Sequence, residues 1–497
     1  MKHTFQKVIF PILIVGLMLS ACVVQKSPVT GKKRAYGYSW EQELQIGREA
    51  DLQIQQQYGV YDDDELQRYV EEVGQRVLSV SHMRREGTDP KYMNTEFHFR
   101  LLDSPIVNAF ALPGGYIYVT RGLLAHLGDE AQLAVVLGHE IGHVAARHAS
   151  QRAFEQQIGQ VALIGGAIAG EELLGIPGGN ILNLGSTAAQ FLFLQYGRDD
   201  ERESDRLGVE YAAMQNYNAA HGAAFFESLE RISEQSGQSI PSFLSTHPDP
   251  GERSQTIPEL AEKWKEEGYK QNVEDRQEYM NAIDNIVFGN DPRQGFAENG
   301  FFYHPELEFQ FPYPEEWQVI NQPSMVALVT PDQDAVMIMQ IDNQSGSPRA
   351  SVNEFLSQQG VNSLNQAATE SNDIPGYEAF ASGRTEDGQE LMFYVYALDY
   401  GGNIYRFLSY TTEDRFGTYS PEFSHVTKGF QQLTDSDILN IRPVRLEVLQ
   451  TDRAAPFESF LPAGLPMNIT PEELAIVNQV SLDETIEEGT YIKIPKQ

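Results

Sequence analysis

The motif His139-Glu140-Ile141-Gly142-His143 constrains this chain more than any other feature, because it lies in an apolar stretch with helical character. Positions i and i+4 share one face of a helix, so the two imidazoles can bind a single metal ion. Glu140 follows the first histidine and can reach a water molecule on that ion. The pattern is an established signature of two zinc ligands and a general base. The sequence therefore predicts a site for one Zn²⁺ per chain, with His139 and His143 as ligands and Glu140 as the catalytic base.

A zinc site of this kind needs a third protein ligand and an open position. The only cysteine of the 497 residues is Cys22, far from the motif. A third histidine in the metzincin manner would need glycine at position 146 and histidine at position 149, and both are alanine. A carboxylate on a later helix is the remaining solution. Spacing alone does not choose among Asp199, Asp200, Glu201, Glu203 and Asp205.

The N-terminus carries a targeting signal. Lys2 and Lys7 precede an apolar run over residues 8–19, which is too short to span a bilayer as a mature helix and is typical of a signal peptide. The run ends in Leu19-Ser20-Ala21-Cys22, which resembles a bacterial lipobox with Cys22 as the lipidated residue; a secretory signal with an incidental cysteine is the alternative. The next residue is Val23 and not aspartate. By the lipoprotein-sorting pattern, this implies the outer membrane of a Gram-negative bacterium, facing the periplasm.

The charge balance excludes one class of partner. The chain has 36 basic and 70 acidic residues, a formal net charge of −34, which becomes −36 once Lys2 and Lys7 are removed with the signal peptide. Binding to a nucleic acid backbone needs clustered Lys and Arg. No nucleic acid partner is therefore expected.

Hydrophobic patterning predicts an α+β, multidomain chain. Strands are expected at 96–102, 108–112 and 116–119, followed by helices over 129–168 and 199–288. Past a breaker-rich linker the pattern predicts strands at 307–311, 336–341, 391–396 and 404–410, with one helix near 352–364. The expected order is a signal peptide (1–21), a tether (22–39), a mainly helical domain with a small sheet (40–288), a linker (289–300), an α+β domain (301–437) and a small C-terminal module (441–497).

Two apolar segments, residues 158–169 and 181–193, flank a break rich in glycine and proline. Each has about a dozen residues, short of the ~20 that span a bilayer. Core helices are expected here, with a mobile lid or a membrane-touching hairpin as the alternative.

Several motifs in a fixed order indicate a family. They are Asn108-Ala109-Phe110-Ala111-Leu112-Pro113-Gly114-Gly115, the motif at 139–143, Glu201-x-x-x-Asp205, and Ser245-Thr246-His247-Pro248 through Arg253. Together they resemble the HtpX/CAAX-prenyl-endopeptidase family of zinc metallopeptidases, in particular its periplasmic BepA-type lipoprotein proteases, over about residues 27–258. The resemblance implies a zincin (gluzincin-like) protease domain.

The resemblance also implies roles for individual residues. Glu201 is the implied third zinc ligand, with Glu203 as second choice, and Asp205 is the implied carboxylate that orients a ligating histidine. His247 is placed near the metal, either stabilising the oxyanion or occupying a fourth zinc position in a self-inhibited state. Arg253 is expected to anchor the loop of His247 to a carboxylate. A substrate peptide is expected to add as a strand beside Asn108, Ala109, Phe110 and Ala111. Ordinary structural or surface roles are expected for His98, His126 and His148.

Two partial resemblances concern the C-terminal half. Residues 307–317, a strand running into a Pro/Trp corner, resemble the opening of PsbP-like α+β domains. Residues 441–497 resemble a LysM module of βααβ order, but Asp452-Arg453-Ala454 stands where that module usually has Gly-Asp-Thr. The segment is therefore expected either to bind glycan or to be a degenerate LysM-like module that serves only in docking.

The function implied is a periplasmic, lipid-anchored zinc metalloendopeptidase that cleaves misfolded or stalled envelope proteins. A second reading is a largely self-inhibited, chaperone-like or docking lipoprotein of outer-membrane assembly. A third, a prenyl-peptide-processing enzyme inside the membrane, is disfavoured by the lack of mature spanning helices. Expected partners are polypeptide substrates, the membrane through Cys22, and either the outer-membrane assembly machinery or peptidoglycan.

Overall fold

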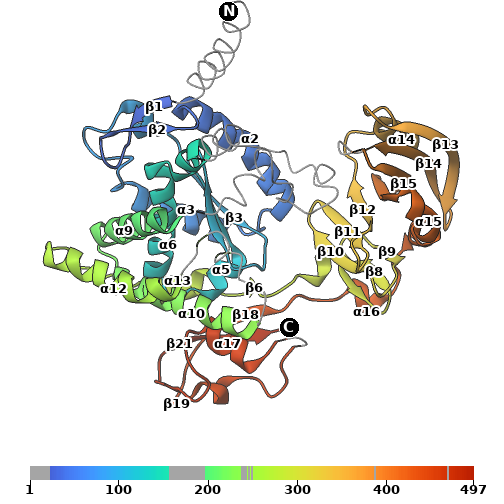
Figure 1. Cartoon of the computed structure of the whole chain (residues 1–497). Coiled ribbons are helices and arrows are strands. Elements are labelled where there is room, and N and C mark those ends of the chain that lie inside the picture. The colour runs from blue at the N-terminus through green and yellow to red at the C-terminus, as the bar shows by residue number, and fades with distance from the viewer. Residues whose placement is uncertain are drawn as a thin grey trace, which may run out of the picture. The chain divides into compact units, whose positions relative to one another are not determined.

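The computed structural model describes residues 23–155, 196–236, 243, 247, 250–384, 388–466 and 469–497 (Figure 1). These residues form two compact units. Unit 1 comprises the residues up to Gln55, Gly59–Gly289 and Val444–Gln497, and unit 2 comprises Gln56–Tyr58 and Asn290–Pro443. The predicted signal peptide, Cys22 and the apolar segments 158–169 and 181–193 lie outside the described residues. The predicted α+β, multidomain class is confirmed at this level.

A three-stranded sheet lies at the centre of unit 1, in the order β3-β5-β4. Strand β3 (His98–Leu102) is parallel to β5 (Tyr116–Thr120), and β4 (Ala109–Leu112) is antiparallel to β5 and forms an edge. The turn between β4 and β5 contains Gly114 and Gly115 at φ of 84° and 98°, a backbone conformation that glycine adopts without steric strain. The sheet therefore has two edges: the outer side of β3 is bridged at Leu102 by Val60, whereas no strand of the described residues pairs with the outer side of β4.

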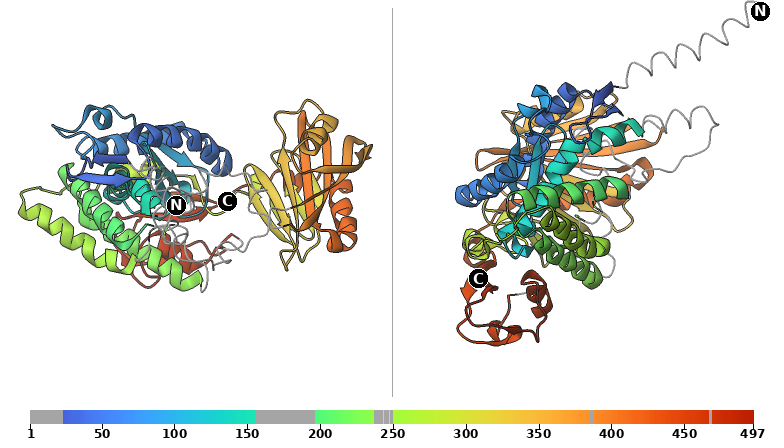
Figure 2. Two further views of the ribbon diagram at one scale, coloured as in Figure 1. Left: turned by 45° about the horizontal axis from the view of Figure 1, so that its top comes forward. Right: turned by 90° about the vertical axis from the view of Figure 1, so that its left-hand side faces the viewer.

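Helices surround this sheet, and α6 (Glu130–Ala146) is buried along its whole length. A helix that is apolar on all sides belongs in a core, which explains its central position. Figure 2 shows α9, α10 and α12 on one flank of the unit. No helix of the described residues is long and apolar enough to cross a membrane. The remaining helical elements of the N-terminal part are α2 (Trp40–Tyr58), α3 (Asp64–Leu78), α4 (Pro90–Met93), α5 (Arg121–His126), α9 (Arg198–Met214), η1 (Ala219–His221), α10 (Gly222–Ser236), α12 (Pro250–Glu266) and α13 (Arg276–Ala282).

Two glycines bring α6 and α9 into close contact. A Cβ atom at Gly138 would lie 2.9 Å from the Gly208 carbonyl oxygen, and one at Gly208 would lie 2.7 Å from the His139 nitrogen. Real Cβ atoms do not approach so closely, so both positions need glycine. This contact places the acidic face of α9 against the histidine motif of α6.

The C-terminal segment belongs to unit 1. Strand β18 (Arg445–Gln450) pairs with both β21 (Tyr491–Lys496) and β6 (Ile286–Val287). Buried Lys493 donates from Nζ to the carbonyls of Ala125 (2.7 Å) and Leu127 (2.9 Å). The sequence predicted a separate module at 441–497; the structure instead packs it on the helical domain. Its other elements are β19 (Ala455–Pro456), η3 (Phe457–Phe460), α17 (Pro471–Val477) and β20 (Thr485–Ile486).

Unit 2 is built on an antiparallel seven-stranded sheet, in the order β10-β11-β12-β16-β15-β14-β13. Its core is rich in aromatic rings, among them Trp317, Phe407 and Phe430. The sheet strands are β10 (Gln318–Gln322), β11 (Met325–Val329), β12 (Ala335–Ile341), β13 (Asn362–Ser371), β14 (Ile374–Arg384), β15 (Glu390–Tyr400) and β16 (Asn403–Thr412). The other elements are η2 (Pro292–Gln294), β7 (Phe296–Glu298), β8 (Phe301–His304), β9 (Phe309–Pro312), α14 (Pro348–Leu356), α15 (Glu413–Lys428), β17 (Gln431–Gln432) and α16 (Ser436–Leu439).

Three predicted segments differ from the structure. The expected tether contains an antiparallel hairpin of β1 (Val23–Lys26) and β2 (Lys33–Tyr36). The expected linker at 289–300 contains η2 and β7, which belong to unit 2. The helix expected near 352–364 ends at Leu356, and residues 362–371 form β13 instead, because that strand pairs with β14 along its length.

Candidate metal centre

Helix α6 supplies the two motif histidines and Glu140. Its first turn is capped by Asp129, whose side chain accepts a hydrogen bond from the Gln132 N–H. His139 and His143, four residues apart, share one face, and their Nε2 atoms are 2.9 Å apart. Burial lowers the pKa of both imidazoles well below the ordinary value, so each ring is neutral and keeps a lone pair. The two rings have the protonation state that a metal ligand needs.

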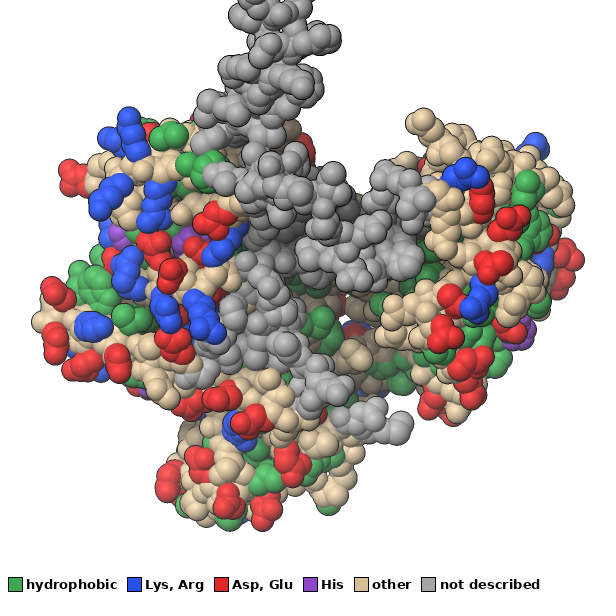
Figure 3. All heavy atoms as spheres, viewed as in Figure 1, with side chains coloured by type: hydrophobic (Ala, Val, Ile, Leu, Met, Phe, Trp, Pro, Cys, Tyr) green, Lys and Arg blue, Asp and Glu red, His purple; other side chains and the backbone are tan. Residues whose placement is uncertain are grey.

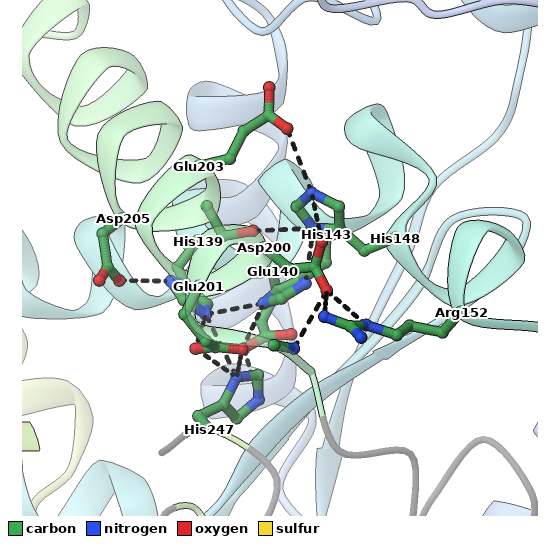
Figure 4. A network of polar contacts seen from close by, with 12 residues as sticks. His139, Glu140, His143, His148, Arg152, Asp200, Glu201, Glu203, Asp205 and His247 are labelled. Atoms are coloured by element: carbon green, nitrogen blue, oxygen red, sulfur yellow. Dashed lines mark hydrogen bonds and ion pairs between the residues drawn. The ribbon is translucent and has the colours of Figure 1, made fainter. Parts of the chain in front are cut away.

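Helix α9 supplies the carboxylate. The Glu201 oxygens lie 3.6 Å from His139 Nε2 and 3.5 Å from His143 Nε2. Glu203 lies apart from these nitrogens, with an oxygen 3.4 Å from His148 Nε2 (Figure 4). Of the two carboxylates that the family resemblance named, Glu201 lies beside both histidines and Glu203 does not.

His247 completes the group. Its Nδ1 lies 3.1 Å from Glu201 Oε1 and 3.3 Å from His139 Nε2, and its ring is fully buried. One ligand atom from each of His139, His143, Glu201 and His247 lies within 4.8 Å of the others. Burial lowers the pKa of His247, so this ring too is neutral. Three imidazoles and a carboxylate are donors that zinc accepts, so the donor set fits that ion.

Glu140 faces the same space without a hydrogen bond among the described residues. Both of its oxygens are buried, and Oε1 lies 3.6 Å from His247 Nε2. Burial raises the pKa of Glu140 to about 7. A buried carboxylate without a hydrogen bond is costly unless it has a ligand or water to bind. Glu140 is therefore poised to accept a proton from a molecule that enters the site.

Asp205 and Arg253 contact residues of the metal-binding group. Asp205 Oδ1 accepts a hydrogen bond from His139 Nδ1 at 2.8 Å, which leaves His139 Nε2 free for the metal side. Arg253, on α12, pairs with Asp205 through Nε at 3.0 Å and also with Glu201. Asp205 thus contacts one motif histidine, and Arg253 contacts both carboxylates; their roles stay predictions.

Residues 64–261 match the model of peptidase family M48. This part of the chain is a peptidase family M48 domain. The family resemblance seen in the sequence motifs is thereby confirmed.

Known relatives each match less than half of this chain. The beta-barrel assembly-enhancing protease of Escherichia coli (strain K12) is 30% identical over 230 residues, 46% of this chain and 45% of that protein. The mitochondrial metalloendopeptidase OMA1 of Schizosaccharomyces pombe is 29% identical over 238 residues, 47% of this chain and 65% of that protein. The mitochondrial metalloendopeptidase OMA1 of Bos taurus is 34% identical over 167 residues, 32% of this chain and 31% of that protein. The matched part is less than two thirds of each relative's length.

Among solved structures, cyanobacterial PsbP from Synechocystis covers 28% of this chain and 91% of its own, with 17% identity and a TM-score of 0.23. The PsbP-like prediction for residues 301–437 and the LysM-like prediction for residues 441–497 stay predictions.

Two residues of the M48 domain were not expected at the site. His148 is fully buried, with Nδ1 3.0 Å from His143 Nδ1, and the Tyr196 ring stacks on the His143 ring with centroids 4.0 Å apart. The helix ends at Ala146 and Arg147 adopts φ 62°, so helical periodicity does not extend to His148. Tyr196 is far from the motif in sequence. No pattern in the sequence marks either residue.

The predicted substrate strand lies beside this centre. Ala109, Phe110 and Ala111 belong to β4, and Asn108 directly precedes it, with its N–H donating to Thr120 Oγ1 at 3.1 Å. Asn108 and the β4 residues are buried. Burial lowers the pKa of His247, and a hydrogen bond with the Ala109 backbone opposes part of that change. His98 and His126, expected to be ordinary, belong to β3 and α5 and are absent from the metal-binding group among the described residues.

Proposed function

We propose that this chain is a zinc-dependent metalloendopeptidase, anchored by lipid at Cys22 and facing the periplasm, that cleaves misfolded or stalled envelope proteins. The M48 domain and its metal-binding group support the reaction. The likeness to a beta-barrel assembly-enhancing protease supports the substrate class and the location. We further propose a gluzincin-like fold for the M48 domain.

His139, His143 and Glu201 hold the metal in this proposal. Zinc, when bound, supplies a Lewis acid that polarises a peptide carbonyl and makes water a stronger nucleophile. Asp205 fixes the proton of His139 on Nδ1, and Glu140 accepts a proton from the attacking water at its carboxylate. Glu140 then delivers that proton to the leaving amine nitrogen, a step that its pKa of about 7 suits at neutral pH. The β4 edge binds the substrate backbone in extended form.

The observation that carries the proposal is the position of the buried Glu140 carboxylate, which lacks a hydrogen bond and lies beside a group of metal donors. Glu140→Gln keeps the shape but removes the base, so we expect proteolysis of an unfolded envelope protein to fall about a thousandfold while zinc content is unchanged. The measurement is single-turnover cleavage together with zinc analysis of the purified chain. Full activity in Glu140→Gln would refute the proposal.

Paired variants test the third ligand. Glu201→Ala should lose stoichiometric zinc because it removes a ligand, whereas Glu203→Ala should keep a full equivalent after dialysis. The reverse result would assign the ligand to Glu203.

The contact between His247 and Glu201 favours a second candidate, in which His247 holds the protease silent and the chain acts as a chaperone-like or docking lipoprotein. His247→Ala should raise proteolysis if the imidazole blocks the site, and lower it if the imidazole stabilises the oxyanion. Rescue of an envelope defect by Glu140→Gln would favour the chaperone-like role.

Two further assignments belong to the same proposal. Lipidation at Cys22 predicts labelling by radioactive palmitate, lost in Cys22→Ala. A LysM-like role for residues 441–497 predicts that the full chain sediments with purified peptidoglycan, and degenerate docking predicts that it does not.

A further inference from the structure

The β1–β2 hairpin is basic in an otherwise acidic protein. Residues 23–36 contain Lys26, Lys32, Lys33 and Arg34 and no acidic residue, whereas the whole chain has 70 acidic residues against 36 basic ones. Figure 3 shows Lys and Arg side chains on the part of unit 1 where β1 and β2 lie in Figure 1. A local charge of this sign attracts an anionic partner even though the molecule as a whole does not.

The hairpin presents these charges outward. Lys26, Lys32 and Lys33 are exposed, and no ion pair engages them among the described residues. Arg34 is half-buried and lies 3.8 Å from a Glu203 oxygen. Val24, on the same strand as Lys26, is 61% exposed. An exposed apolar side chain next to unpaired lysines suits a surface with anionic groups over an apolar layer.

The pairing within the hairpin gives independent support. Lys26 lies directly opposite Lys33 in the antiparallel register, on the outer face of the two strands. Like charges in directly opposed positions destabilise a strand pair. An anionic partner between the two ammonium groups removes this repulsion, which folding alone leaves in place.

The hairpin is also fixed to the M48 domain. The Arg147 guanidinium lies 3.7 Å from the ring centroid of fully buried Tyr36 and donates to Gln25 Oε1 at 2.7 Å. The Tyr92 hydroxyl donates to the Lys26 carbonyl at 3.2 Å. Arg147 follows His143 by four residues and caps the end of α6, so the hairpin packs against the end of the helix that carries the two histidines.

We propose that the β1–β2 hairpin binds the phosphodiester headgroups of an anionic phospholipid surface and orients the M48 domain on it. The hairpin begins directly after Cys22, so a lipid on that residue would bring the lysines to the headgroups. At physiological ionic strength the Debye length is about 8 Å, so the surface acts on the local charge of the hairpin rather than on the net charge of −34. The location rests on the proposed function; the headgroup contact does not need the acyl chain.

The test uses the full chain with Cys22→Ala, which removes any acyl contribution. It should co-sediment with vesicles of phosphatidylethanolamine and phosphatidylglycerol, and not with vesicles of phosphatidylcholine alone, and binding should fall as salt rises. Each lysine at such a surface contributes about a fivefold change in affinity, so Lys26→Gln, Lys32→Gln and Lys33→Gln together should weaken binding about a hundredfold. Lysine-to-arginine changes at the same positions should retain it.

The matched control carries the same change of charge elsewhere: Lys263→Gln, Lys265→Gln and Lys270→Gln, all at exposed positions. Equal loss in the control and the hairpin variants would overturn the proposal, as would equal binding to the neutral vesicles. Competition by inorganic phosphate beyond that of chloride at the same ionic strength would indicate a free-phosphate site and also overturn it. If palmitate labelling fails but the Cys22→Ala chain still binds anionic vesicles, the lipid anchor is wrong and the headgroup contact stands.

Discussion

The Nδ1 atoms of the two motif histidines contact different kinds of partner, a carboxylate in one case and an imidazole in the other. His139 Nδ1 faces Asp205 directly, but His143 Nδ1 faces another imidazole, that of His148, at 3.0 Å. If His143 Nε2 binds metal, its proton must lie on Nδ1 and be donated to His148 Nδ1. His148 then carries its own proton on Nε2, which points to the Glu203 carboxylate at 3.4 Å. His148 is thus a positioning residue that fixes the tautomer of His143.

We expect His148→Ala to weaken zinc binding about 10–100-fold, because partners that orient a ligating histidine have effects of that size. Competition with a chromophoric chelator measures this affinity directly. The control is His98→Ala, which alters a histidine stacked on Tyr116 in the sheet and should leave zinc affinity unchanged. Equal zinc affinity in both variants would show that His148 does not position the ligand.

At the scale of elements, the C-terminal strand β21 is tied to helix α5 by one buried lysine. Lys493 is fully buried, burial lowers the pKa of its amine well below the usual value, and its Nζ donates to two backbone carbonyls at the end of α5. A helix C-terminus attracts positive charge, which offsets part of the cost of burial.

Lys493→Met should lower the free energy of unfolding of unit 1 by about 3 kcal/mol, because the carbonyls of Ala125 and Leu127 lose their donor inside the protein. Urea denaturation measures this loss. Lys496→Met changes an exposed lysine of the same strand and serves as the control. A similar midpoint for both variants would contradict the interpretation.

In unit 2, Asp342 connects the end of β12 to helix α14. Its side chain accepts hydrogen bonds from the N–H groups of Gln344 and Ser345 and from the Ser351 hydroxyl at 2.6 Å. Burial raises the pKa of Asp342, but these hydrogen bonds outweigh it and lower the pKa to about 2.

The folded pKa of Asp342 lies below the unfolded value, so the carboxylate stabilises unit 2 above about pH 4 and the stabilisation is lost as the pH falls toward 2. Because solvent screens this carboxylate in part, we expect the difference to amount to about 1 kcal/mol. Asp342→Asn should therefore reduce the pH dependence of unfolding in this range, as measured by denaturant titration of the unit 2 transition. Asp332→Asn, at an exposed position, should keep the full dependence.

At the scale of the whole molecule, unit 2 is an insertion in unit 1. Residues 290–443 of unit 2 follow β6 in the sequence and end just before β18, both of which belong to unit 1. The Phe288 N–H donates to the Val444 carbonyl at 2.8 Å. The two ends of the insertion are therefore adjacent, and β6 and β18 pair across them.

Replacing residues 291–442 by a short glycine-serine linker should leave the M48 domain folded and able to bind zinc. Truncation after Gly289 removes β18, β21 and Lys493 as well, and should leave a chain that unfolds more readily or aggregates. Zinc content and thermal unfolding of the two deletions distinguish these results. If the truncated chain is as stable as the internal deletion, the C-terminal segment is not part of the unit.

Local sequence patterns were sufficient to predict features whose residues are close together in the sequence. His139, Glu140 and His143 follow from helical spacing, and the strands at 98–102, 109–112 and 116–120 follow from alternation between turns. Longer-range features were missed or misplaced. The segment 362–371 became a strand because β14 pairs with it, and the tether became a hairpin because Tyr36 and Gln25 pack on Arg147.

The sequence by itself determined the M48 domain, the helix that carries the histidine motif and the set of carboxylates that could complete the site. Only the tertiary structure decided that Glu201 rather than Glu203 lies beside both histidines, that His148 contacts His143, and that the C-terminal strands belong to the same unit. The physical reason is distance along the chain. Periodicity reports which residues share a face of one helix, whereas the close contact of Gly138 with Gly208 decides which residues of another helix that face meets.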